Sequence, residues 1–187
     1  MRPSATWAAA IGFAVLACVV TAVTPVSNLA YSTNATRMPF DLPMTLGETT
    51  TGRTFTAEPT AVRAASSIEA EDGPVEGTFL IVDLVLDGTG VEPSTRLGGI
   101  KLELGERTYY PASRIRRTLV DESLRAGLPV AGSIVFELPP DDFRGKARVV
   151  LANRLDIRFD DRLVLDVDLD SLEPRPSVVV EPAGWAE

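Results

Sequence analysis

Short runs in which apolar and polar residues alternate recur along this chain, and they constrain its fold more than any other feature. The clearest run lies within residues 127–138, where a turn containing two glycines and a proline leads into Ile134, Phe136 and Leu138 at alternate positions. A side-chain period of two is typical of a strand with one buried face. The pattern therefore predicts a central strand whose core face carries these three residues.

Similar runs predict about seven short strands. Residues 78–86 place leucine and valine at even positions, so their even-numbered face should be buried. Residues 100–110 are typical of a hairpin, and alternation at 147–151 and 163–169 predicts two more strands. Residues 53–68 fit an edge strand, or two short strands with a bend at Pro59, and 61–65 also fit a helical turn. The expected fold is an all-β antiparallel β-sandwich over residues 46–170.

The N-terminal region is predicted to reach a membrane. No charged residue lies between Arg2 and Arg37, and residues 7–26 are almost wholly apolar, about the 20 residues that a membrane-spanning helix needs. We expect residues 1–26 to form one transmembrane helix with a cytoplasmic N-terminus. Two alternatives remain: a signal peptide cleaved near Ala22, which would release the protein, and a lipobox ending at Cys18.

The segments that flank the predicted domain lack a sustained period. Residues 27–45 are rich in polar residues and proline, which favours a linker between membrane and domain. Residues 171–187 contain three prolines, so we expect an extended and poorly ordered tail in which 178–180 forms at most a short strand.

Composition excludes several classes of function. The chain has 18 basic and 26 acidic residues, a net charge of -8, and its basic residues are dispersed. Nucleic-acid surfaces need clustered lysine and arginine, so no nucleic-acid partner is expected. The chain has no histidine and 1 cysteine, Cys18. Mechanisms that use histidine, a cysteine nucleophile or a Cys/His zinc site are therefore excluded from the domain, and we expect no cofactor.

The chain resembles the DUF4352 family of bacterial extracytoplasmic domains. The matching elements are the Gly47-Glu48 turn with 53–55, the strand at 77–83, the hairpin at 102–110, and most specifically residues 127–139. The resemblance implies an immunoglobulin-like sandwich similar to that of the mycobacterial secreted antigen MPT63, in a membrane-anchored or secreted protein. It implies no catalytic set. The family often has asparagine after the 77–83 strand, where this chain has Asp87-Gly88-Thr89.

Acidic residues near the C-terminus are candidate calcium ligands. Three of them alternate on one predicted strand and two more lie just upstream: Asp166, Asp168, Asp170, Asp160 and Asp161. Oxygen-rich clusters suit Ca²⁺, but no Asp-x-Asp-x-Asp-Gly loop accompanies these acids. We therefore favour a solvent-facing charged edge and predict no metal site.

Two groups of residues are candidates for an interaction surface. Phe79 and Ile81 make the second face of the 78–86 strand apolar, which predicts cover by the linker, the membrane or a partner. Arg114, Arg116 and Arg117 could hold anionic lipid or an acidic partner, although a solvated loop balanced by nearby acids is the favoured interpretation.

These observations favour a non-catalytic, membrane-anchored extracytoplasmic binding or accessory module of the bacterial envelope, with a protein partner there. One alternative is a structural subunit of a larger membrane complex, which would cover the apolar patch at Phe79 and Ile81. A carboxylate-based hydrolase is a further, less favoured alternative. Such an enzyme needs two carboxyl groups at a fixed separation across a cleft, whereas the adjacent acids Asp141 and Asp142 are typical of a polar turn.

Overall fold

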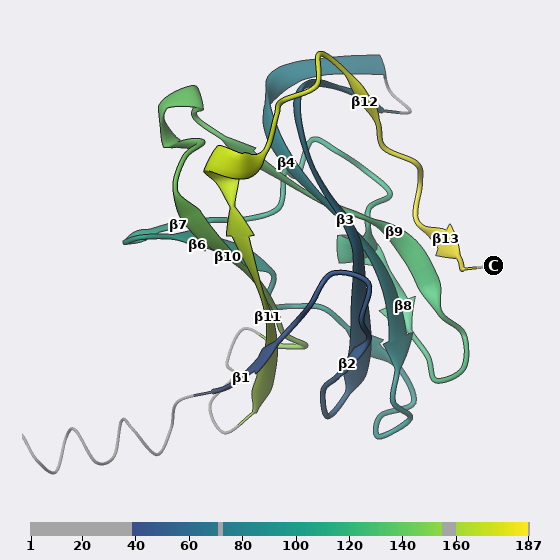
Figure 1. Ribbon diagram of the computed structural model, residues 1–187. Helices are drawn as coiled ribbons and strands as arrows, with labels where there is room; N and C mark the ends of the chain where they lie inside the picture. The colour runs from purple at the N-terminus through teal and green to yellow at the C-terminus, as the bar shows by residue number, and fades with distance from the viewer. Residues whose placement is uncertain (1–38, 71–72, 155–159, 187) are drawn as a thin grey trace, which may run out of the picture. The chain divides into compact units, whose positions relative to one another are not determined.

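The computed structural model describes residues 39–70, 73–154 and 160–186 (Figure 1). The predicted anchor at 1–26, its topology, Cys18 and the first part of the predicted linker lie outside these residues. Residues from Pro39 onward form one compact unit. Within the described ranges, no helix is long and apolar enough to cross a membrane.

Two main sheets make up this unit. The first has the order β1-β11-β10-β6-β7, formed by β1 (Phe40–Pro43), β11 (Asp161–Asp168), β10 (Lys146–Leu151), β6 (Lys101–Leu104) and β7 (Arg107–Tyr109). The β6–β7 pair is the hairpin that the sequence predicts. β1 pairs with β11 in parallel, so the predicted linker ends in a strand instead of continuing to residue 45.

The second sheet contains the longest strands. Its order is β12-β3-β4-β9-β13, formed by β12 (Val178–Val179), β3 (Phe55–Ala70), β4 (Gly73–Gly88), β9 (Val130–Leu138) and β13 (Gly184–Trp185), with β2 (Thr50–Thr51) also pairing with β3. β5 (Thr95–Arg96) and β8 (Ser123–Leu124) form a separate pair. Three 3-10 turns complete the described elements: η1 (Leu119–Asp121), η2 (Pro140–Asp142) and η3 (Leu169–Ser171).

The main core lies between the two sheets, which makes the domain a β-sandwich. The even-numbered face of β4 and the predicted face of β9 pack into this core together with alternate residues of β10 and β11. Phe136 has no exposed surface, whereas Glu137, the next residue, is exposed. The buried faces predicted by the period-two pattern are therefore confirmed, and so is the all-β fold.

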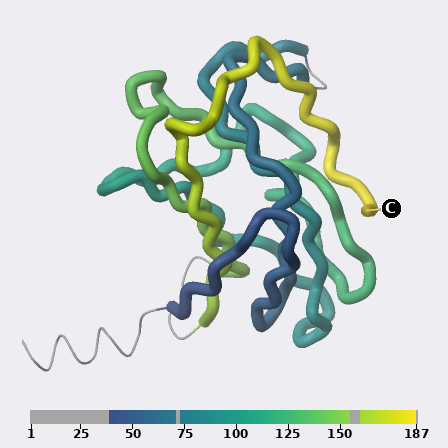
Figure 2. The backbone as a smooth tube through the Cα atoms, viewed as in Figure 1, coloured from purple at the N-terminus to yellow at the C-terminus, as the bar shows by residue number. Residues whose placement is uncertain are grey.

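A second, smaller core covers the outer face of the β3–β4–β9 sheet. Phe79 and Ile81 are fully buried there, against Ile115, Val178 and Val180. The last two residues belong to the C-terminal segment, which pairs with β3 through β12 and with β9 through β13. Since β3 and β9 lie on opposite sides of β4, this segment crosses the outer face of the sheet (Figure 2). We call residues 177–186 the C-terminal strap.

The strap corrects two predictions. Residues 171–187 were expected to be a poorly ordered tail, but the strap is hydrogen-bonded at both sheet edges and contributes buried valines. Phe79 and Ile81 were expected to form an interaction surface, but the chain itself covers them. The reason is that alternating valines at 178 and 180 can cover an apolar sheet face even when prolines keep the strand short.

Smaller differences concern the strands themselves. Residues 55–70 form one strand with register shifts near Pro59 and after Ala65, with no helical turn. Strand β9 is flanked by β13 only at Val130 and Ala131, so it is central for part of its length. Two pairings are parallel, β1 with β11 and β12 with β3, so the sandwich is not wholly antiparallel.

Candidate binding cleft

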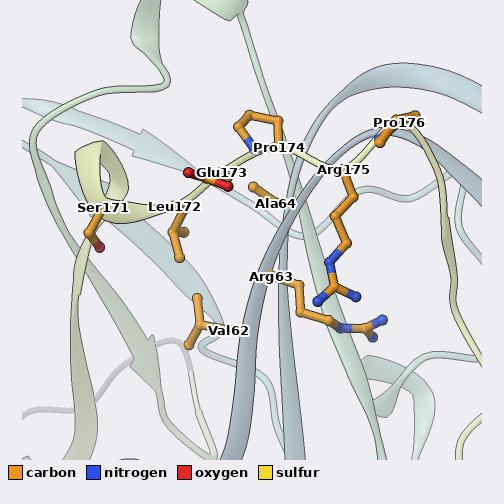
Figure 3. A pocket seen from close by; sticks show the side chains of 9 residues that line it. All are labelled: Val62, Arg63, Ala64, Ser171, Leu172, Glu173, Pro174, Arg175 and Pro176. Atoms are coloured by element: carbon orange, nitrogen blue, oxygen red, sulfur yellow. The ribbon is translucent and has the colours of Figure 1, made fainter.

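A cleft of about 570 Å³ lies between the edge of β3 and the segment that follows η3 (Figure 3). Two short stretches of chain line it: Val62, Arg63 and Ala64 of β3, and residues 171–176. Val62 packs toward the main core, whereas the side chain of Arg63 lies on the outer face with Asp83. Successive strand residues point to opposite faces, so the cleft reaches around the sheet edge.

The sequence Pro174-Arg175-Pro176 fixes the far wall of the cleft. Proline has no backbone N–H, so Arg175 is the one residue of this triplet that can donate a backbone hydrogen bond to the sheet. It donates to the Ala64 carbonyl at 2.9 Å, and its own carbonyl accepts from the Ser66 N–H at 2.9 Å. These two bonds hold the segment beside β3 and place the arginine side chain over the strand (Figure 3).

Arg63 is held in a fixed orientation by its neighbours on the outer face of the sheet. Its Nε and Nη2 each lie 2.7 Å from a carboxylate oxygen of Asp83. The Ser133 hydroxyl donates to the same carboxylate at 2.6 Å. Both partners of the ion pair are half-buried, so the guanidinium is screened from water on that side. The hydrogen bond from Nη2 is charge-assisted and holds the guanidinium group against Asp83.

Arg175 differs from Arg63 in its charge balance. The side chains of Arg63 and Arg175 both line the cleft (Figure 3). Asp83 compensates Arg63. Across residues 39–70, 73–154 and 160–186, the Arg175 guanidinium has no ion pair or hydrogen bond. Glu173 also lines the cleft, but among the described residues it forms no ion pair with Arg175, so the Arg175 guanidinium can still bind an anionic group.

A second charged cluster covers the outer face of the other sheet, and its charges cancel. We call it the outer-face ion network; it comprises three acids and three bases, Asp41, Glu103, Asp166, Lys101, Arg148 and Arg162. Hydrogen bonds from Arg162 lower the pKa of Asp41 below its usual range, and the same contact raises the pKa of Arg162. Burial acts to raise the pKa of Glu103, but Lys101 and the nearby arginines lower it overall.

The predicted acidic cluster is dispersed in the structure. Arg53 binds Asp160 through Nε and Nη2, at 2.9 and 2.6 Å, and lowers its pKa. The backbone N–H of Arg53 donates to Asp161. Asp166 and Asp168 are exposed on β11, and Asp170 lies beyond the end of that strand, where its N–H donates to Asp168. Within the described ranges, no group of three or more acids could hold a metal ion.

The three predicted arginines have separate environments. Arg114 pairs with Glu137 and lies 5.4 Å above the Phe79 ring, so its partner is a β9 acid and not the loop acids that were expected. Arg116 and Arg117 are exposed and make contacts of their own. The carbonyl of Arg117 accepts from the Ala183 N–H at 2.8 Å, which ties this loop to the C-terminal strap.

Asp142, one of the acids considered for hydrolysis, binds basic and phenolic groups. It accepts hydrogen bonds from the Tyr109 hydroxyl and from Arg107, and the Tyr109 bond is the main cause of its lowered pKa. These contacts join the β6–β7 hairpin to η2. A carboxyl group with a lowered pKa remains ionised, whereas a general acid needs a raised one.

Sequence reasoning did not single out Arg63 or Arg175. The sequence contains one local signal for Arg175. It lies between two prolines, so its backbone N–H is the one donor of a segment that cannot form a regular strand. The partner of that donor lies in β3, far away in the sequence. The position of Arg175 beside Arg63 is therefore a product of the tertiary fold.

Comparison with known proteins found two solved structures of limited similarity. The sequence matches no protein-family profile and no curated protein. An uncharacterised β-sandwich protein from Clostridium difficile 630 is similar with a TM-score of 0.49 and 6% identity, over 70% of this chain and 97% of that one. A protein proposed to be a lipoprotein, from Bacillus subtilis subsp. subtilis strain 168, has a TM-score of 0.48 and 12% identity, over 68% of this chain and 40% of that one.

Proposed function

We propose that this protein is a non-catalytic binding module of the bacterial envelope, and that the cleft between β3 and residues 171–176 is its binding site. The observation that carries the proposal is the pair of arginines in the cleft. Arg63 is oriented by Asp83, and two backbone hydrogen bonds hold the main chain of Arg175 beside it while the Arg175 guanidinium has no ion pair among the described residues. A group that is oriented before a ligand arrives, as Arg63 is, loses little conformational freedom on binding, which favours affinity.

The ionisation of the acids supports binding over catalysis. The pKa values of four described acids are displaced, those of Asp41, Glu103, Asp142 and Asp160, and all four are lowered. Their hydrogen bonds come from arginine, lysine or tyrosine, which stabilise the charged carboxylate. Acid–base catalysis by carboxylates usually needs at least one group with a raised pKa. The pattern is that of structural ion pairs.

We further propose that the β-sandwich is an immunoglobulin-like domain of the DUF4352 type, held at the outer side of the membrane by residues 1–26. The support is the uncharged run at 7–26 and the sequence resemblance over 46–169. Secretion after cleavage near Ala22 is the alternative. Protease added to intact spheroplasts should digest the domain and leave the anchor in the membrane. Protection of the domain would refute the orientation, and recovery of a soluble domain in the medium would favour secretion.

The structural-subunit alternative loses its sequence basis. It depended on an exposed apolar patch at Phe79 and Ile81, and both residues are covered by the chain's own strap. We do not carry that alternative forward.

Site-specific crosslinking in cells tests the binding site. A photoreactive side chain would replace Glu173, which lines the cleft, and in a matched strain Asp166, whose side chain is 88% exposed on the other sheet. The full chain would be expressed at its natural level. We expect a discrete crosslinked product from position 173 and none from position 166. Equal labelling at both positions, or none at either, would refute the assignment of the cleft.

A further inference from the structure

The charged clusters of the described residues differ in whether their charges cancel. The outer-face ion network has equal numbers of acids and bases, and Arg53, Arg107 and Arg114 each have an acidic partner. In the cleft, Asp83 compensates Arg63 alone. Glu173 also lines the cleft, but among the described residues neither arginine forms an ion pair with it, so an oxyanion that contacts both guanidinium groups would be stabilised there.

Arg63 keeps hydrogen-bonding capacity for such a ligand. A guanidinium has five N–H donors, of which one on Nη2 donates to Asp83, while Nε lies 2.7 Å from the other carboxylate oxygen without a hydrogen bond. One on Nη1 reaches the Val179 carbonyl at 3.5 Å. Among the described residues, the other Nη donors of Arg63 and the Arg175 guanidinium make no hydrogen bond, and both side chains line the cleft. Arginine forks match the geometry of carboxylate and phosphate oxygens.

The edge of β3 adds a second kind of recognition. The Ala64 carbonyl is directed outward to the Arg175 N–H, so Ala64 forms a non-hydrogen-bonded pair with Leu80 of β4. Hydrogen-bonded and non-hydrogen-bonded pairs alternate along an antiparallel ladder, so Val62, two residues before Ala64, is also in a non-hydrogen-bonded pair. Its N–H and C=O therefore point away from β4, into the cleft. Neighbouring segments bond to Pro59 and Ala64, and the backbone between them at Val62 has no partner among the described residues. An unpaired edge of this kind can hydrogen-bond an extended peptide.

The other walls of the cleft limit the charge of the ligand. Glu173 contributes a carboxylate, and Leu172, Pro174 and Pro176 contribute apolar surface. A dianion such as a phosphate monoester would meet repulsion from Glu173, while a single carboxylate would meet less. The apolar residues suit the aliphatic part of a peptide.

From these observations we infer that the cleft binds an extended acidic peptide segment of a partner protein. A glutamate or aspartate carboxylate of that segment would bridge Arg63 and Arg175, and its backbone would pair with the open edge at Val62. This inference rests on the proposed binding function and names the partner's chemistry. It assigns no sequence beyond an acidic residue in extended backbone.

The test uses the full chain in detergent micelles and a fluorescein-labelled, terminally blocked peptide, Thr-Glu-Val-Glu-Thr. Fluorescence anisotropy should show saturable binding that weakens as salt is raised. The same peptide with glutamine in place of both glutamates should bind at least tenfold more weakly. Arg175→Gln should weaken the acidic peptide at least tenfold, and Arg175→Glu should abolish its binding. Arg96→Glu, an exposed arginine outside the cleft, should change binding less than twofold.

Competition experiments distinguish the contribution of the carboxylate to binding from that of the peptide backbone. N-acetylglutamate amide carries the same side chain on one residue and should compete only at concentrations at least tenfold above the peptide, and inorganic phosphate should compete no better than chloride. Equal competition by the single residue would overturn the peptide inference, and strong competition by phosphate would overturn the carboxylate. If crosslinking from position 173 persists unchanged in Arg175→Glu cells, this inference fails and the proposed function stands. If the wild-type chain gives no crosslink, the proposed function itself fails.

Discussion

The C-terminal strap should contribute measurably to stability, and Val178→Ala is the substitution that measures it. Val178 is 5% exposed and packs in the second core with Phe79 and Ile81. Its replacement by alanine removes two buried carbon groups, each contributing about 0.8 kcal/mol. The cavity left behind adds to this cost. We expect a loss of about 1.5–2.5 kcal/mol in the free energy of unfolding.

The neighbouring valine provides a matched control. Val179 is 50% exposed and keeps the same backbone pairing with β3. Val179→Ala removes the same atoms from a position that is half in water, so its effect should lie within about 0.5 kcal/mol. Any difference between the two variants therefore reports burial, because composition and position in the chain are nearly identical.

Urea unfolding followed by circular dichroism is a suitable assay. Val178→Ala should lower the midpoint without changing the slope, because the same surface is exposed on unfolding. For a domain of about 150 residues, the expected loss corresponds to a fall in Tm of roughly 3–10 °C. Equal and small effects of both substitutions would refute the packing of the strap. A changed slope in Val178→Ala alone would show that the strap unfolds separately from the sandwich.

Three further predictions concern other parts of the domain. The Arg162 contact lowers the pKa of Asp41 from its usual 3.8, so its contribution to stability is present above that value and is lost as the pH falls through the lowered one. In Asp41→Asn, the free energy of unfolding should therefore fall less steeply than in the wild type as the pH is lowered below about 4. An unchanged dependence on pH in this range would contradict the prediction. A Cβ at Gly99 would lie 2.4 Å from a backbone oxygen, whereas one at Gly184 meets nothing within 4 Å. Thermal melts should show Gly99→Ala destabilised by about 1–3 kcal/mol or more and Gly184→Ala little changed, and similar melts would refute the close approach. Calcium held a hundredfold above a dissociation constant would add about 2.7 kcal/mol of stability. We expect equal Tm in millimolar calcium and in chelator; a calcium-dependent rise lost in Asp160→Asn would disprove this.

Local patterns in the sequence determined which faces of the strands are buried. Alternation identified the core sides of β4, β9, β10 and β11, and Gly105-Glu106 identified the turn of the β6–β7 hairpin. These features are local because a strand's side chains alternate whatever lies opposite them, and turn residues act on their own backbone. The same alternation showed that the second face of β4 is apolar, and the structure shows it buried.

Only the tertiary structure decided what covers that second face and where the charges meet. The period of two reports that a face is buried but carries no information about which segment buries it, so the strap over Phe79 was missed. Likewise, Arg63 and Arg175 come together through backbone bonds between β3 and a segment far away in the sequence, bonds that depend on the register of the folded chain. The acids near the C-terminus follow the same rule. Asp160 faces Arg53 because folding brings the residues just before β11 against those just before β3, a contact between distant parts of the chain that no local pattern records.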